Sequence, residues 1–280
     1  MLEIGNYNTL KIIKDLDFGV YLDGGEGLEI LLPARYVPVN VKTGDEVEVF
    51  IYHDNEGRLI ATTARPLAVV GEFRFMEVKS VNPTGAFLNW GIMKDLLVPF
   101  REQKMPMQEG RWYVVYVHLD HLSGRIVASA RIEKYLDNVV PSYIKGQEVD
   151  LLVTDETDIG YKVIINNLHW GLVYHNEIFR SLEKGESLKG YIKEVREDEK
   201  IDVTLAPLGY RKVEGIASLV LESLKVHNGF LPLHDKSAPE EIYALFACSK
   251  KAFKQAIGAL YKEGIITIES SGIRIVPTKT

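Results

Sequence analysis

The chain has 280 residues, of which 46% are hydrophobic and 26% charged, a composition typical of an ordinary globular protein. Its net charge of −6 argues against a protein that binds nucleic acid through bulk positive charge alone. The amino terminus lacks a basic stretch followed by an apolar one, and no apolar run approaches the roughly 18 residues of a membrane span. Cys248 is the only cysteine, which excludes an internal disulfide. We therefore expect a cytoplasmic protein without a membrane segment.

Three glycine-anchored segments share one internal spacing. Gly19, Gly85 and Gly160 each have a second glycine fourteen residues upstream and a third glycine twenty-five residues downstream. Further landmarks keep the same register: Pro33, Pro99 and Tyr174 lie fourteen residues after their anchors. Such a repeat indicates one structural unit used three times in succession.

Each copy contains five short β-rich runs separated by turn residues. In the first copy these runs are 9–17, 18–24, 27–33, 45–54 and 57–65, and the later copies follow the same order. A hairpin turn is expected between the last two runs of each copy, at 53–57, 121–124 and 197–200. Five strands with a longer connection between the third and the fourth predict a small closed barrel. The anchor glycine begins the second strand, where we expect a sharp bend or the close passage of another backbone.

The last seventy residues follow a different pattern. A helix is predicted over 213–229 and ends at Asn228-Gly229, which is a common carboxyl-terminal signal. Ser237 and Ser249 are expected to begin two further helices, and a β-hairpin is expected around Ser271-Gly272. Three helices followed by a hairpin resemble a winged-helix domain.

The barrel motifs resemble the RNA-binding OB-fold repeat of the largest small-subunit ribosomal protein, the S-one domain. Segment 18–21 is similar to the family's Phe-Gly-Ala-Phe run, 171–177 is similar to its Gly-Leu-Val-His run, and 44–47 to its Gly-Asp-x-Val run. Three such barrels followed by a winged helix resemble the conserved virulence factor B family of bacteria. That resemblance implies RNA binding and a regulatory or accessory role, and it supplies no catalytic residues.

We accordingly predict a mainly β protein with an α+β tail, made of three tandem five-stranded OB-fold barrels and a winged helix. The predicted domains are residues 1–66, 67–137, 138–208 and 211–280. The net charge differs between the four segments: it is −5 for residues 1–70, +1 for 71–137, −5 for 138–210 and +3 for 211–280. The second barrel and the tail are therefore the parts that repel phosphate least.

The candidate RNA-binding residues lie at corresponding positions of the three copies. Aromatic rings stack on bases, and arginine pairs with phosphate or stacks on a base. The first copy is the best preserved and the third the most degraded, with Lys162, Trp170 and Tyr174 as substitutes. The candidates are Phe18, Tyr21, Arg65, Phe87, Arg131, Lys162 and Tyr174. The alternative is that the aromatic side chains fill or cap the barrels.

In the winged helix, Lys250, Lys251 and Lys254 are candidates for phosphate contacts, because the third helix commonly enters the major groove in that family. Alternatively these lysines form a solvated helix face, and the domain binds a protein.

No spacing in the chain assembles a catalytic triad, a carboxylate pair or a metal site, so we predict no enzyme activity, no cofactor and no metal. The first hypothesis is an RNA-binding regulator of gene expression that holds single-stranded RNA. The alternatives are a transcription regulator that binds DNA through the winged helix and a protein-interaction scaffold with inactive barrels.

Overall fold

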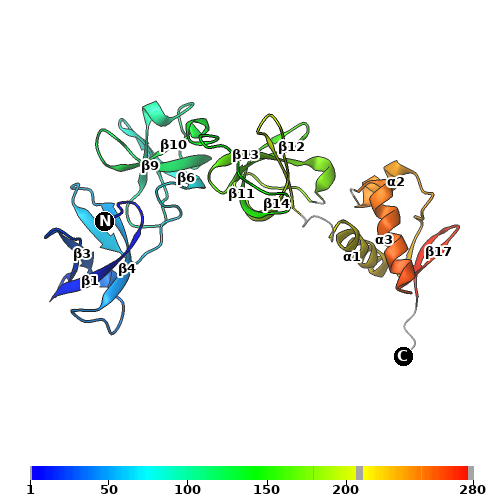
Figure 1. The fold of residues 1–280 in the computed structure, drawn as a ribbon, viewed down its shortest axis with the longest axis horizontal. Coiled ribbons are helices and arrows are strands. Elements are labelled where there is room, and N and C mark those ends of the chain that lie inside the picture. Colours follow the sequence, from blue (N-terminus) through cyan, green and yellow to red (C-terminus); the bar gives the residue numbers. More distant parts are fainter. Residues whose placement is uncertain (1, 179, 206–210, 247, 277–280) are drawn as a thin grey trace. The chain divides into compact units, whose positions relative to one another are not determined.

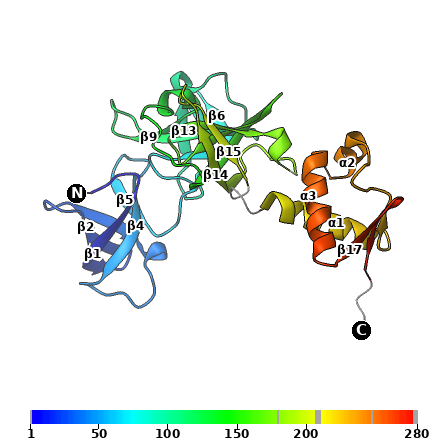
Figure 2. The ribbon, with the colours of Figure 1, turned by 45° about the vertical axis from the view of Figure 1, so that its right-hand side comes forward.

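The computed structural model describes residues 2–178, 180–205, 211–246 and 248–276. It divides into two compact units, Met1–Leu136 and Asp137–Thr280. In chain order, three β regions precede a helical region, and Figures 1 and 2 show this order in two views. The fold is therefore mainly β with a helical tail, as the sequence predicts.

The first barrel is closed by five strands in the order β1-β2-β3-β5-β4. Their bounds are β1 (Tyr7–Leu16), β2 (Gly19–Asp23), β3 (Glu29–Pro33), β4 (Glu46–His53) and β5 (Leu59–Thr62). Every pair is antiparallel except the closing pair β3–β5. Alternate residues such as Val20 and Leu22 point into the barrel and are buried. A short 3-10 turn, Ala34–Tyr36, follows β3.

The second region repeats this strand order but is an open sheet, β10-β9-β6-β7-β8. Its strands are β6 (Phe73–Asn82), β7 (Gly85–Leu88), β8 (Leu96–Pro99), β9 (Trp112–Leu119) and β10 (Ile126–Ser129). β8 and β10 lie side by side without a ladder between them. The seam is bridged after the strands end, where Ala130 N–H donates to the Glu102 carbonyl at 2.9 Å. The prediction of a five-stranded unit is confirmed. This copy differs from the other two in having no hydrogen-bonded ladder between β8 and β10.

The third barrel is again closed, in the order β11-β12-β13-β15-β14. Its strands are β11 (Glu148–Thr157), β12 (Gly160–Ile165), β13 (His169–Tyr174), β14 (Ser187–Val195) and β15 (Ile201–Thr204). Here the parallel pair β13–β15 closes the barrel over three residue pairs. The core holds Val163, Ile192 and Val203, all fully buried.

The anchor glycines begin β2, β7 and β12, and close backbone approach explains them. A Cβ on Gly19 or Gly85 would lie 2.3 Å from the carbonyl oxygen of Leu32 or Val98, and one on Gly160 would lie 2.2 Å from that of Val173. No other residue type fits such a contact without displacing the neighbouring strand. The repeated glycine is thus a packing requirement of the barrel.

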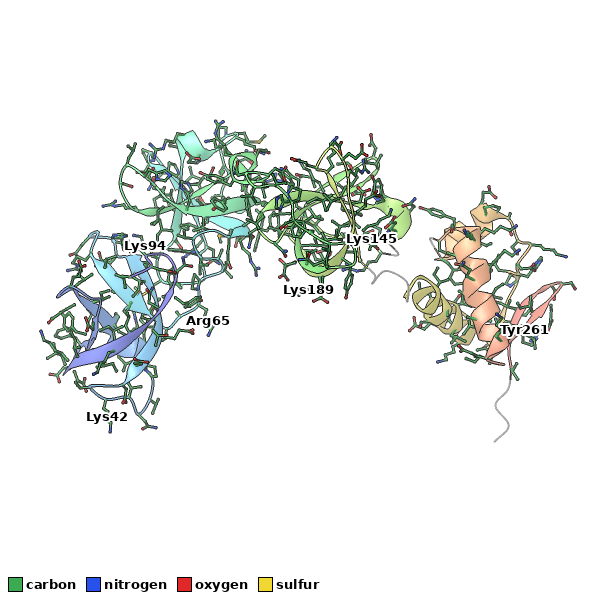
Figure 3. All side chains as sticks on the ribbon, in the orientation of Figure 1. Lys42, Arg65, Lys94, Lys145, Lys189 and Tyr261 are labelled. Atoms are coloured by element: carbon green, nitrogen blue, oxygen red, sulfur yellow. The ribbon has the colours of Figure 1, made fainter. Side chains whose placement is uncertain are left out.

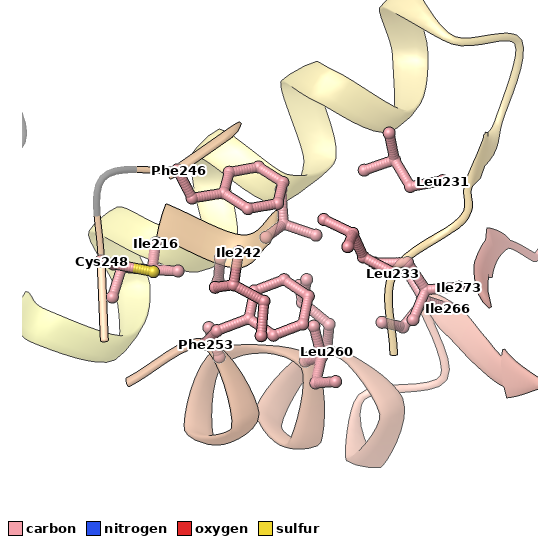
Figure 4. Packing of buried hydrophobic residues seen from close by; sticks show 14 of the residues in the cluster. Ile216, Leu231, Leu233, Ile242, Phe246, Cys248, Phe253, Leu260, Ile266 and Ile273 are labelled. Atoms are coloured by element: carbon pink, nitrogen blue, oxygen red, sulfur yellow. The ribbon is translucent and has the colours of Figure 1, made fainter. Parts of the chain in front are cut away.

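The tail contains the three helices and the three-stranded sheet of a winged helix. Its elements are α1 (Arg211–Val226), β16 (Phe230–Leu231), α2 (Pro239–Phe246), α3 (Lys250–Lys262), β17 (Ile266–Glu269) and β18 (Gly272–Ile275). The Ser249 hydroxyl caps α3 by accepting from Ala252 N–H at 3.3 Å. The Ser237 hydroxyl instead accepts from His234 N–H in the turn before α2. Figure 4 shows Phe246, Phe253 and buried Cys248 in the core between the helices.

The first two barrels share one hydrophobic cluster inside the first unit. Phe50 and Tyr52 of β4 pack edge-on against Trp90, whose ring is 1% exposed. The indole N–H of Trp90 donates to the Ala68 carbonyl at 2.8 Å. The predicted boundary between residues 66 and 67 therefore falls beside a continuous core, and the domain boundaries remain predictions.

Candidate nucleic-acid interface

The first barrel presents two aromatic rings on its outer surface. Phe18 lies immediately before β2 and is 57% exposed, and Tyr21 lies on β2 between the buried residues Val20 and Leu22. The two rings meet edge to face, with centroids 6.3 Å apart and planes at 89°. Phe18 does not fill the barrel, so the core explanation fails for this side chain. An exposed aromatic ring supported by a second ring is suited to stacking on a base.

Arg65 has different neighbours from Phe18 and Tyr21. Its guanidinium lies 3.3 Å from a carboxylate oxygen of Glu48 and 5.4 Å from the ring centroid of Tyr7. Its side chain is 75% exposed, so it remains accessible despite this ion pair. The structure thus brings Phe18 and Tyr21 together and assigns Arg65 to a separate contact. Figure 3 labels its position on the first barrel.

Arg35 is an exposed cation, one residue beyond the backbone contact of Phe18, that the sequence analysis missed. Ala34 N–H donates to the Phe18 carbonyl at 2.9 Å, which holds the turn after β3 beside the aromatic pair. Arg35 follows in this turn, is exposed, and lies 4.8 Å from the ring centroid of Tyr36. The sequence did contain a signal for this residue, because Arg35 lies two positions after Pro33, a landmark of the repeat.

In the second barrel, Phe87 occupies the position of Tyr21, two residues after the anchor glycine. It is half-buried and lines a pocket of about 200 Å³. Arg131 is exposed, and its Nε donates to the Arg101 carbonyl at 3.0 Å. The two predicted residues therefore have separate local partners, and Arg131 fastens the turn that follows β8.

The third barrel holds a groove of about 710 Å³ beside β13 and β15. The ammonium of Lys162 lies 3.7 Å from the ring centroid of Trp170, a cation–π contact inside this groove. Arg196 and Lys200 also line the groove, together with Ile159, which is 60% exposed. Five carboxylates also line the groove, and Arg196 and Lys200 are paired with Asp202 and Asp198. The charge of the groove therefore does not by itself favour a phosphate.

Tyr174 is fixed by a polar network at the edge of this groove. Its hydroxyl accepts from Arg196 and donates to Asp202, and the ammonium of Lys193 lies 5.4 Å from its ring centroid. Arg196 also pairs with Asp202, which is only 7% exposed. The structure therefore places the three substitutes Lys162, Trp170 and Tyr174 at one region of the third barrel, with Arg196 as an additional member.

The three lysines of the winged helix differ in their contacts. Lys250 donates to the Lys236 carbonyl at 3.2 Å, and the ammonium of Lys254 lies 3.8 Å from a carboxylate oxygen of Asp235. Lys251 is exposed, and within the described part of the chain its side chain forms no ion pair or hydrogen bond. Lys251 is consequently the lysine of this helix most accessible to a phosphate.

The first barrel contains an acidic groove. A groove of about 1060 Å³ along the start of β1 is lined by Glu3, Asp23 and Glu26 and by no lysine or arginine. Within the ranges that the structure describes, no cluster of three metal-ligating side chains is found, and no helix is long and apolar enough to cross a membrane.

Comparison with known proteins identifies both kinds of domain. Residues 4–64 match the S1 domain family model, and residues 218–275 match the CvfB-like winged helix domain model. The chain is 29% identical to the uncharacterized protein YitL of Bacillus subtilis, over 95% of this chain and 91% of that protein. It is 26% identical to conserved virulence factor B of Staphylococcus aureus, over 97% and 94%.

Solved structures include a multidomain protein with nucleic acid binding domains from Streptococcus pneumoniae, at 24% identity, TM-score 0.43 and 98% coverage of both chains. The resemblance to the conserved virulence factor B family is confirmed by the two domain matches and the nearly full-length relatives. An S1 domain together with a winged helix indicates nucleic-acid binding.

Proposed function

We propose that this chain, a relative of the conserved virulence factor B proteins along nearly its whole length, is a cytoplasmic RNA-binding regulator of gene expression. It binds single-stranded RNA on the outer faces of its barrels, and the winged helix adds phosphate contacts. It performs no catalysis, because its matched domains are binding modules.

The observation that carries this proposal is the exposed ring of Phe18 against Tyr21. Exposing a phenyl ring to water is unfavourable, and the barrel core is complete without it. A base stacked on this ring would cover the apolar surface and gain roughly 1–3 kcal/mol. Arg35 follows Ala34, whose N–H donates to the Phe18 carbonyl, and supplies an exposed cation for an adjoining phosphate.

Single-stranded rather than double-stranded nucleic acid fits this arrangement. The Phe18 and Tyr21 rings are surface groups at the start of one strand, and a paired base inside a duplex offers no free face to them. The third barrel offers a comparable aromatic contact, because the ammonium of Lys162 lies over the Trp170 ring in its groove.

The test is the affinity of the full chain for a labelled single-stranded RNA, the matching single-stranded DNA and duplex DNA, at two salt concentrations. We expect Phe18→Ala with Tyr21→Ala to weaken RNA binding roughly tenfold or more, because two stacking side chains are removed. Val39→Ala with Leu122→Ala is the control, since these apolar side chains are each 86% exposed and lie outside the aromatic pair.

Unchanged RNA affinity in the Phe18/Tyr21 variant, with native circular dichroism, would contradict the proposal. Tighter binding to one duplex sequence than to RNA would favour a transcription regulator. Binding to none of the three nucleic acids would leave the scaffold alternative.

A further inference from the structure

A small pocket lies where the first two barrels meet, inside the first compact unit. It has a volume of about 200 Å³ and is lined from the first barrel by Tyr52 and His53, and from the second by Phe87, Lys94 and Arg125. Figure 3 labels Lys94 at this junction. Drug-sized ligands occupy about 300–1,000 Å³, so this pocket limits its occupant to a single small ring system.

Two cations face the pocket without a carboxylate partner. The Lys94 ammonium donates to the carbonyls of His53 at 2.5 Å and Asp54 at 3.0 Å. Arg125 is exposed, and neither it nor Lys94 forms an ion pair among the described residues. The carboxylates nearby are already engaged, because Asp95 pairs with Lys79 and Asp54 with Arg58. The pocket is therefore electropositive.

One buried polar atom of the pocket has no hydrogen-bond partner. His53 Nδ1 is inaccessible to solvent and unpaired in the described structure. Burial, followed by the charges of Lys94 and Arg125, lowers the pKa of His53, so its ring is neutral at pH 7. Buried polar groups are nearly always paired in native proteins, so this unpaired nitrogen in the pocket wall is an exception.

The wall of the pocket is aromatic and rigid. Trp90 is fixed by its bond to the Ala68 carbonyl and by edge contacts with Phe50 and Tyr52. Phe87 is only half-buried, and it is also the residue that the repeat places where Tyr21 lies in the first barrel. A flat ring can lie against this wall, with hydrogen-bonding and charged groups around it.

We propose that this junction pocket binds one nucleotide of a single-stranded RNA, with its base against Phe87 and its phosphate at Lys94 and Arg125. The inference rests on the proposed function, because it adds a second binding point for the same RNA strand. A site built from both barrels also fixes the strand's register, because only one nucleotide at a time can enter it.

The experiment measures binding of a labelled single-stranded RNA to the full chain carrying Arg125→Gln or Phe87→Leu. The controls are Arg111→Gln and Phe75→Leu, which change the same residue types in the same barrel outside the pocket. We expect each pocket variant to weaken binding roughly 5-fold or more, as removal of a stacking partner does, and each control to stay within about twofold. Arg125 has no ion pair in the described structure, so its variant tests the pocket even where Phe87→Leu impairs folding.

A second arm locates the bound nucleotide. RNA containing 4-thiouridine is crosslinked to the wild-type chain by light, and the modified peptides are identified by mass spectrometry. We expect crosslinks in 85–97 or 123–127, and we expect competition by 5′-AMP but not by inorganic phosphate at equal concentration.

Pocket variants that bind RNA as tightly as their controls, while Phe18→Ala with Tyr21→Ala loses binding, would overturn the pocket and leave the proposed function intact. Loss of binding in the pocket variants alone would support the pocket and contradict the first-barrel stacking site. Equal competition by phosphate and 5′-AMP would show a simple anion site and overturn the nucleotide assignment.

Discussion

Tyr21, Phe87 and Lys162 occupy one position of the repeat, two residues after the anchor glycine, yet each has different neighbours. Tyr21 meets Phe18, Phe87 borders the junction pocket, and Lys162 covers Trp170. None of the three belongs to a hydrophobic core cluster. One backbone site thus presents three different chemical groups at the surface, which suits contacts with different parts of a nucleic-acid strand.

Glu102 gives a residue-scale prediction on pH dependence. Burial by itself raises the pKa of Glu102, but the Ser129 hydroxyl, which donates to it at 2.6 Å, and the Lys134 charge outweigh burial and hold the pKa below its ordinary value. A carboxyl group whose pKa is lowered in the folded state stabilises the fold above its unfolded pKa, and this contribution disappears as the pH falls through the folded pKa.

Ser129→Ala should therefore destabilise the second barrel by about 1.5–3 kcal/mol at pH 7, the range for a hydrogen bond to a charged group, and by less at pH 3. Denaturant unfolding at the two pH values measures the difference. Ser80→Ala, an exposed strand serine, serves as the control and should show little change at either pH. An equal destabilisation by Ser129→Ala at both pH values would contradict the role of Glu102.

At the scale of the element, the second strand of each unit depends on its first residue. Gly160 begins β12, and a Cβ there would lie 2.2 Å from the Val173 carbonyl oxygen of β13. The same glycine in all three copies therefore allows two strands to approach closely. It also places Tyr21, Phe87 and Lys162 at the same position of the second strand in each copy.

Gly160→Ala should cost about 1–3 kcal/mol, as overpacking in a dense structure does. Hydrogen–deuterium exchange followed by mass spectrometry should show faster exchange in 160–174 and unchanged exchange in α3. Gly258→Ala is the matched control, because a Cβ at this α3 position meets nothing within 4 Å and alanine is the better helix former. Exchange in α3 should then become slower. If β12 and β13 exchange as slowly in the Gly160→Ala variant as in the wild type, the two strands accommodate the added methyl group without loss of stability, and the prediction is wrong.

At the scale of the whole molecule, charge is distributed unevenly along the chain. The segment 211–280 has a net charge of +3, whereas 1–70 and 138–210 have −5 each. Long-range attraction to phosphate is therefore expected from the tail, and stacking and local cation contacts from the barrels.

Replacing Lys250, Lys251 and Lys254 with alanine should weaken binding to all RNA sequences alike. The salt slope should fall by about 2, because each phosphate that a lysine no longer neutralises removes about 0.7 from the slope for a single strand. Lys262→Ala, at the other end of α3, is the control. Titrations at several salt concentrations with two unrelated RNA sequences provide the measurement.

Deleting 211–280 should weaken RNA binding in the same way and to a greater extent, because the whole positively charged tail is removed. Unchanged affinity after this deletion would assign the winged helix to a protein partner.

The sequence by itself determined the repeated unit, the five strands of each copy and the helices of the tail. These features depend on local rules: alternation of buried and exposed residues, glycine where backbones approach, and the Ser249 cap of α3. The exposed pair Phe18 and Tyr21 was also predictable, because both residues lie within four positions of one strand start.

Only the tertiary structure decided which distant side chains meet. Arg65 contacts Glu48 and Tyr7 instead of the aromatic pair, and the Ala34 N–H, next to Arg35, donates to the Phe18 carbonyl. The open seam of the second barrel and the junction pocket depend on how strands far apart in the chain close and how two barrels pack. Such contacts are set by the docking of whole surfaces, and the local periodicity of a sequence contains no record of that docking.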